Sequence, residues 1–128
     1  KDTPKVQYER KSKRQREPQD YDEISLFFED KEGCEKIFAQ PKINIDRLAH
    51  ISNIDANDWR NYLNDENLSF SELKKKLRVA YANRLIAEGF LEKFTIDSLA
   101  QTIGYSSRTS FYSAYKEVTG ETWSRNNS

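Results

Sequence analysis

The chain has 128 residues, enough for one compact domain with a tail but not for two independent cores. A single cysteine and a single histidine exclude an internal disulfide and a Cys/His metal cage, and no run of roughly 18 apolar residues is present to span a bilayer. The 21 basic and 21 acidic residues give a formal net charge of zero, which by itself argues against a nucleic-acid partner.

The first 20 residues are highly charged and contain almost nothing to bury. A basic run from Arg10 to Arg16 is followed by Glu17, Pro18 and an acidic stretch. We predict a charged linker or tail over residues 1–20; a solvated charge run, a phosphate-binding arm and a membrane-proximal basic anchor are the alternatives. Because the chain starts at Lys1 without a methionine, we expect it to be a piece of a longer protein.

Residues 21–40 are predicted to form one short docking helix. Apolar side chains recur there with partial helical spacing, and Pro41 ends the stretch because it disfavours helix at the residue before it. The apolar positions are Ile24, Phe27, Phe28, Ile37 and Phe38.

Residues 41–128 are predicted to form the main domain, which begins with two short helices joined by a tight turn. Asn53 and Ile54 mark the turn, and Asp55 is placed to cap the second helix. The residues expected to face inward are Ile45, Leu48, Ala49 and Ile51 in the first helix and Trp59, Tyr62 and Leu63 in the second.

A long helix is predicted from Phe70 to Ala87, about 27 Å at about 1.5 Å per residue, and it can act as a rigid spacer. Ser69 and Glu72 have the spacing of a capping box, and Gly89 supplies a left-handed stop. The expected apolar stripe consists of Leu73, Leu77, Ala80, Tyr81, Arg84, Leu85 and Ile86.

A second pair of helices follows, and its sequence repeats the first pair. The segment from Ile96 to Ala100 matches the segment from Ile45 to Ala49. Thr95 caps the first of these helices, Ser106 or Ser107 caps the second, and Gly120 ends it. The inward positions are Ile96, Leu99, Ala100 and Ile103, then Phe111, Tyr115 and Val118.

The repeated segments supply three features that a helix-turn-helix unit needs. Ala49 and Ala100 are small enough for two helices to cross near a right angle, and Asn53 and Gly104 tolerate a left-handed turn. The anchors of the second helices are Trp59 and Leu63, then Phe111 and Tyr115. We therefore predict an all-α fold in which a long linker helix joins two helix-turn-helix subdomains; a generic helical hairpin is the alternative for either segment alone.

The second helix of such a unit leaves its first polar residues free to enter the major groove of double-stranded DNA. Asn can pair with adenine and Arg with guanine through two hydrogen bonds each. The candidate DNA-binding residues are Asn57, Arg60, Asn61 and Asn64 in the first unit and Ser107, Arg108, Ser110, Tyr112, Ser113 and Lys116 in the second. The long helix is expected to place the two units in successive major grooves, about 34 Å apart.

The stretch from Ile43 to Thr122 resembles the DNA-binding domain of AraC/XylS-type transcription regulators. The stretch from Thr95 to Thr122 looks like the signature of this family. In that signature a first helix with Ile and Ala is followed by a Gly-Phe turn; the second helix starts with Ser-x-Phe and ends with Phe-Lys, and Gly-x-Thr-Pro closes the pattern. Arg78 and Ala82, four residues apart, resemble a pair in the family's linker helix. Trp123 replaces the closing Pro of this pattern.

The resemblance implies a seven-helix fold, binding to promoter or operator DNA, and activation or repression of transcription in the bacterial cytoplasm. It also implies an N-terminal sensor or effector region in a longer chain, sometimes membrane-anchored, with dimerisation through that region and RNA polymerase as a further partner. No cofactor and no metal are expected. Tyr105 and Tyr115 replace phenylalanines of the family, and Ser113 replaces a frequent arginine.

Two other classes of function compete with DNA binding. A helical protein-interaction module on the same scaffold, with weak or no DNA binding, fits the neutral net charge. An enzyme is the least supported class, because no nucleophile stands near a recognisable base or a phosphate-binding loop. We expect His50 to be a surface or hydrogen-bonded histidine.

Overall fold

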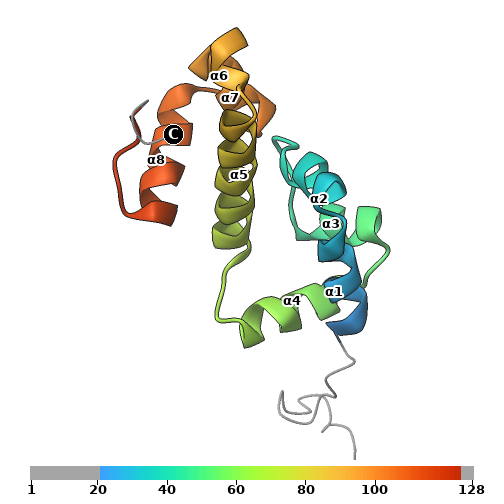
Figure 1. Cartoon of the computed structure of the whole chain (residues 1–128). Helices are drawn as coiled ribbons and strands as arrows, with labels where there is room; N and C mark the ends of the chain where they lie inside the picture. The colour runs from blue at the N-terminus through green and yellow to red at the C-terminus, as the bar shows by residue number, and fades with distance from the viewer. Residues whose placement is uncertain (1–20, 125–128) are drawn as a thin grey trace, which may run out of the picture.

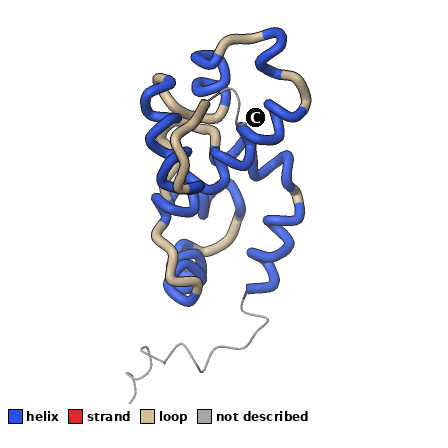
Figure 2. The backbone as a smooth tube through the Cα atoms, turned by 60° about the vertical axis from the view of Figure 1, so that its left-hand side comes forward, coloured by secondary structure: helices blue, strands red, loops and turns tan. Residues whose placement is uncertain are grey.

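The computed structural model describes residues 21–124, which fold into eight helices with no β-strand in that range (Figures 1 and 2). The helices are α1 (Asp22–Glu29), α2 (Lys31–Phe38), α3 (Ile45–Ser52), α4 (Ala56–Asp65), α5 (Phe70–Ala87), α6 (Phe90–Lys93), α7 (Ile96–Thr102) and α8 (Arg108–Thr119). The predicted charged tail lies outside the described residues. Between Tyr21 and Ser124, no helix is both long enough and apolar enough to cross a membrane.

The long helix α5 runs between two hydrophobic cores (Figure 1). The buried residues of the first core are Ile24, Phe38, Ile43, Leu48, Ile54, Trp59, Leu63 and Leu73. The buried residues of the second core are Val79, Ala82, Leu99, Ala100, Ile103, Phe111, Ala114 and Tyr115. Each helix-turn-helix unit therefore buries its own apolar face, and α5 contributes side chains to both cores.

The predicted apolar stripe of α5 is only partly correct, because this helix is covered from two sides. Leu73 lies in the first core and Val79 in the second. Ala80 and Arg84, which were expected in the stripe, are exposed, whereas Arg78 is buried with 3% of its surface accessible. Helical spacing identifies a helix, but a helix that packs in two directions has no single apolar face.

Side chains at the helix starts determine where several helices begin. The Ser69 hydroxyl accepts the N–H of Glu72 at 3.0 Å, and the Glu72 carboxylate accepts the N–H of Ser69 at 2.8 Å. This reciprocal capping box starts α5 at the predicted residue. Asp55, Thr95 and Ser107 cap α4, α7 and α8 through their side-chain oxygens, so Ser107 is the cap among the two predicted candidates.

Both tight turns have the predicted left-handed backbone. Asn53 ends α3 with a φ of 59°, and Gly104, after α7, has a φ of 115°. Ala49 packs against the first core and Ala100 is fully buried in the second, as crossing helices require. The two helix-turn-helix units predicted from the repeat are therefore present.

Residues 21–40 form two helices, not the single short helix predicted. Asp30 separates them, because its carboxylate accepts the N–H of Gly33 at 3.0 Å and so starts α2. Ile24 of α1 and Phe38 of α2 both enter the first core. This division and the single turn of α6 raise the six helices predicted from the sequence to eight among the described residues, where the family resemblance implied seven.

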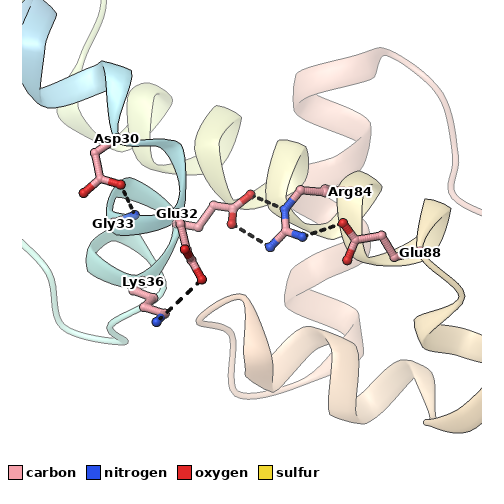
Figure 3. Close-up of polar contacts among 7 residues, drawn as sticks. Asp30, Glu32, Gly33, Lys36, Arg84 and Glu88 are labelled. Atoms are coloured by element: carbon pink, nitrogen blue, oxygen red, sulfur yellow. Dashed lines mark hydrogen bonds and ion pairs between the residues drawn. The ribbon is translucent and has the colours of Figure 1, made fainter.

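An exposed ion-pair network attaches α2 to the end of α5 (Figure 3). The Arg84 guanidinium donates two hydrogen bonds of 2.7 Å to the Glu35 carboxylate and one of 2.8 Å to Glu88. These bonds, chiefly the pair to Glu35, raise the pKa of Arg84 further above its usual range. A bidentate contact fixes orientation as well as distance, so it helps to set α2 against the linker helix.

Candidate nucleic-acid interface

Helix α8 is anchored by one face and presents a polar face to solvent. Phe111 is fully buried and Tyr115 nearly so, and α8 packs against both α5 and α7. Four of the predicted residues of this unit have exposed side chains: Ser107, Arg108, Ser113 and Lys116. Ser110 and Tyr112 are half-buried. The polar positions therefore point outward from a helix whose orientation the core fixes.

Thr109 is a further exposed residue on this helix, and it was missed in the sequence analysis. It precedes Ser113 by four residues and Lys116 by seven, the spacing of neighbours on one helical face. That spacing was available in the sequence. Thr109 therefore belongs with Ser113 and Lys116 in the polar face of α8.

Arg108 is held beside the start of the preceding helix. Its Nε lies 3.7 Å from Oδ1 of Asp97, and both side chains are more than half exposed. An exposed ion pair of this kind contributes little stability, typically about 0–1 kcal/mol. The guanidinium is therefore oriented by Asp97 and still available to a stronger partner such as a guanine edge.

Tyr112 is less available than its neighbours, because its ring stacks on that of Trp123. The ring centroids are 5.4 Å apart with an interplanar angle of 15°. Trp123 also packs against Phe111 of the second core, at 5.9 Å between centroids. The tryptophan that replaces the proline of the family pattern thus covers part of the end of this unit.

In the first unit, the predicted residues bind one another. The Arg60 guanidinium donates to the Asn57 side-chain oxygen at 3.1 Å and lies 3.6 Å from Oδ1 of Asp46. Asn57, Arg60 and Asn64 are exposed, and Asn61 is half-buried. Adenine would use the same amide oxygen of Asn57 as an acceptor, so Arg60 competes with a base for it.

The second helices of the two units differ in charge and direction. Around α4, from Asp55 to Glu66, four carboxylates and one guanidinium give a formal charge of −3. Around α8, from Ser107 to Gly120, two cationic side chains and one carboxylate give a formal charge of +1. In Figure 1, α8 runs alongside α5, whereas α4 lies across the end where α5 begins, so their axes point in different directions. The surface around α8 is the more favourable of the two for phosphate.

The described residues offer little for metal or redox chemistry. Between Tyr21 and Ser124 no three His, Cys, Asp or Glu side chains lie together as a metal site requires. Cys34 is buried beside an apolar groove of about 310 Å³ between α1, α2 and α5. Burial, together with the charges of Asp30 and Glu35, raises the pKa of its thiol to about 11, so it stays protonated and unreactive near neutral pH.

Comparison with known proteins supports the fold. Neither a protein-family model nor a curated protein matches this sequence. Among solved structures, the chain is similar to the C-terminal domain of AraT, a response regulator from Geobacillus stearothermophilus, with a TM-score of 0.59 and 20% identity. The alignment covers 87% of this chain and 83% of that chain. The prediction of an all-α fold with two units about a linker helix is confirmed.

Proposed function

We propose that this chain binds double-stranded DNA sequence-specifically as part of a transcription regulator of AraC type. The observation that carries the proposal is the outward polar face of α8, on a helix fixed by its buried anchors within a helix-turn-helix unit. Such a helix fits the major groove, where its first residues meet base edges. The fold shared with a domain of a response regulator supports the same proposal.

We assign the residues of α8 two kinds of contact: some recognise bases and so specify the DNA sequence, and others bind phosphate and so position the helix on the duplex. Arg108 binds a guanine through two hydrogen bonds after leaving Asp97, and the hydroxyls of Thr109 and Ser113 bind bases or phosphates. Ser107 contacts DNA at the start of the helix while its oxygen caps α8 by accepting the N–H of Ser110. Lys116, near the end of the helix, binds the phosphate backbone. The stacked ring of Tyr112 supports the helix more than it contacts DNA.

The first unit plays a secondary role in the proposed DNA binding. Asn57 and Arg60 read a second major groove once their mutual hydrogen bond opens, while Asn61 and Asn64 add polar contacts. The four carboxylates around α4 weaken binding there by repelling phosphate. The different directions of α4 and α8 mean that both enter DNA together only if the duplex adapts its shape.

The proposal extends to the setting of the domain. We place it in the bacterial cytoplasm, at a promoter or operator, joined to a sensor or effector region through which the protein dimerises, with RNA polymerase as a further partner. The neighbouring structure is itself the C-terminal domain of a response regulator, which supports a modular protein of this kind.

Selection from a pool of random duplex DNA tests the proposal directly. Recovery of one preferred sequence, bound with an affinity that falls steeply between low and moderate salt, is the expected result. Arg108→Ala should cost about 1–3 kcal/mol at one base position, whereas Lys116→Ala should weaken binding to all sequences alike. Failure to enrich any sequence, or equal binding by both variants and the parent, would overturn it.

A protein-interaction module on the same scaffold is the second candidate. The formal net charge of zero and the acidic surroundings of α4 favour it, because both reduce attraction to phosphate. It predicts that the chain retains no DNA at low salt, where phosphate contacts are strongest. The same binding measurement therefore separates the two candidates.

A further inference from the structure

Arg78 is a buried cation with no carboxylate partner among its described hydrogen bonds. From the middle of α5 its Nε donates to the carbonyl of Phe38 at 2.8 Å, and its Nη2 donates to the carbonyl of Gln40, also at 2.8 Å. These carbonyls lie at the end of α2, where the helix dipole is negative. The charge is therefore stabilised by the backbone at the end of α2, which packs into the first core through Phe38.

The same guanidinium also lies against the turn of the second unit. Its Cζ is 4.7 Å from the centre of the Tyr105 ring, a cation–π distance. A Cβ atom at Gly104 would lie 2.7 Å from both Cζ and Nε of Arg78 and 2.8 Å from the carbonyl oxygen of Ala39. Only a glycine lets the second turn, the guanidinium and the end of α2 meet this closely.

Arg78 is thus the point where the linker helix meets the turn of the second unit and the end of α2, which packs with the first unit in one core through Phe38. A guanidinium binds a fixed set of acceptors in one plane, so it specifies orientation and not only proximity. An apolar residue would fill much of the same space, but it would leave the Phe38 carbonyl without its side-chain donor and the Gln40 carbonyl with only the N–H of Ile43, at 3.2 Å. It would also not distinguish one angle between the packed parts from another.

We propose that Arg78 is a positioning residue that locks the two helix-turn-helix units at one relative orientation and so sets the spacing of DNA half-sites that both can bind. The part of this statement that concerns DNA rests on the proposed function. The part that concerns the orientation of the units does not, and the two parts are tested separately.

Distances between spin labels test the orientation without DNA. In a Cys34→Ala background, labels are attached at His50→Cys and Gln101→Cys, exposed positions that are equivalent in the two repeats. The parent should give one narrow distance distribution. Arg78→Met should broaden or shift it, and Arg78→Lys should give an intermediate result. Ile24→Val, which removes a buried methyl group from the first core, controls for lost stability and should leave the distribution unchanged.

Half-site spacing tests the consequence for DNA. On the selected sequence, moving one half-site by half a helical turn should weaken binding of the parent by about 10-fold or more, because the second unit no longer binds from a tethered position. Arg78→Met should bind the original site more weakly and show little dependence on spacing. Ile24→Val should keep the full dependence.

Each outcome has one meaning. An unchanged label distribution in Arg78→Met would show that Arg78 does not lock the units. If Arg78→Met broadened the label distribution but its DNA affinity still depended fully on half-site spacing, Arg78 would orient the units without setting the spacing of half-sites. If the parent binds no DNA, the proposed function fails, and the label distances still decide whether Arg78 orients the units.

Discussion

Asp97 and Arg108 form an ion pair between the first and second helices of one unit, with 3.7 Å between Oδ1 and Nε. The repeat-equivalent aspartate of the other unit, Asp46, lies 3.6 Å from Arg60. In both units, an acidic residue in the first turn of the first helix therefore holds an arginine of the candidate DNA-binding helix. The arrangement orients the arginine, and under the proposed function the same carboxylate competes with DNA for it.

Asp97→Asn should increase DNA affinity by about 1.4- to five-fold, because an exposed ion pair of about 0.2–1 kcal/mol no longer competes for Arg108. Removing a carboxylate close to phosphate acts in the same direction. Titration of labelled duplex at fixed salt measures the change. Glu29→Gln removes an exposed carboxylate at the end of α1 and should have a smaller effect. Equal gains in both variants would show that net charge alone is responsible.

Gly104→Ala should destabilise the protein by about 1–3 kcal/mol or more, because the new Cβ would lie 2.7 Å from Arg78 and the backbone φ is 115°. Gly120→Ala is the matched control, since its φ is 81° but nothing lies within 4 Å of the added carbon. It should cost only the backbone strain, about 1–2 kcal/mol. Denaturant unfolding measures both, and equal losses would contradict the close approach of Arg78 to the turn.

Cys34 should resist alkylation at pH 8–9 in the folded protein, because its thiol has a pKa of about 11 in place of 9.0. Its reaction with iodoacetamide should accelerate as pH approaches 11. The folded state holds this proton more tightly than the unfolded chain, so the stability that Cys34 contributes is complete below pH 9 and is lost as pH rises toward 11.

Comparison with Cys34→Ala isolates this pH dependence from that of tyrosines and lysines. The difference in unfolding free energy between the parent and the variant should shrink between pH 9 and 11. Rapid labelling of the folded parent at pH 8, at the rate of the denatured chain, would contradict the buried environment of the thiol.

Ser69→Ala should lower the free energy of unfolding by about 1 kcal/mol, because it removes the side chain that accepts the N–H of Glu72 at the start of α5. Ser71→Ala tests the same substitution two residues further along, where the serine is exposed and is not the cap. That variant should change the stability by a few tenths of a kcal/mol at most. A similar loss in both variants would assign the effect to helix propensity and not to the cap.

Much of the fold followed from local sequence patterns. Asn53 and Gly104 predicted left-handed turns, and Ser69 with Glu72 predicted the start of α5, because these features depend on residues within three or four positions of each other. The break at Asp30 was missed, since a short helix with partial apolar spacing looks continuous until its internal cap is recognised.

The candidate site was only partly predictable. Exposure of Arg108, Ser113 and Lys116 agrees with the helical pattern, and Thr109 was present in that pattern but overlooked. The stacking of Tyr112 on Trp123 was not predicted, because it brings together residues from a helix and from the segment beyond it.

The sequence by itself determined the two repeated units, their turns and the length of the helix between them, because short-range hydrogen bonding and apolar spacing encode such features. Only the tertiary structure decided which side of α5 each unit covers and that Arg78 is buried between Phe38, Gln40 and Tyr105. Those contacts join residues about 27 to 40 positions apart along the chain, and a buried arginine is stabilised only after distant backbone carbonyls have been brought to it.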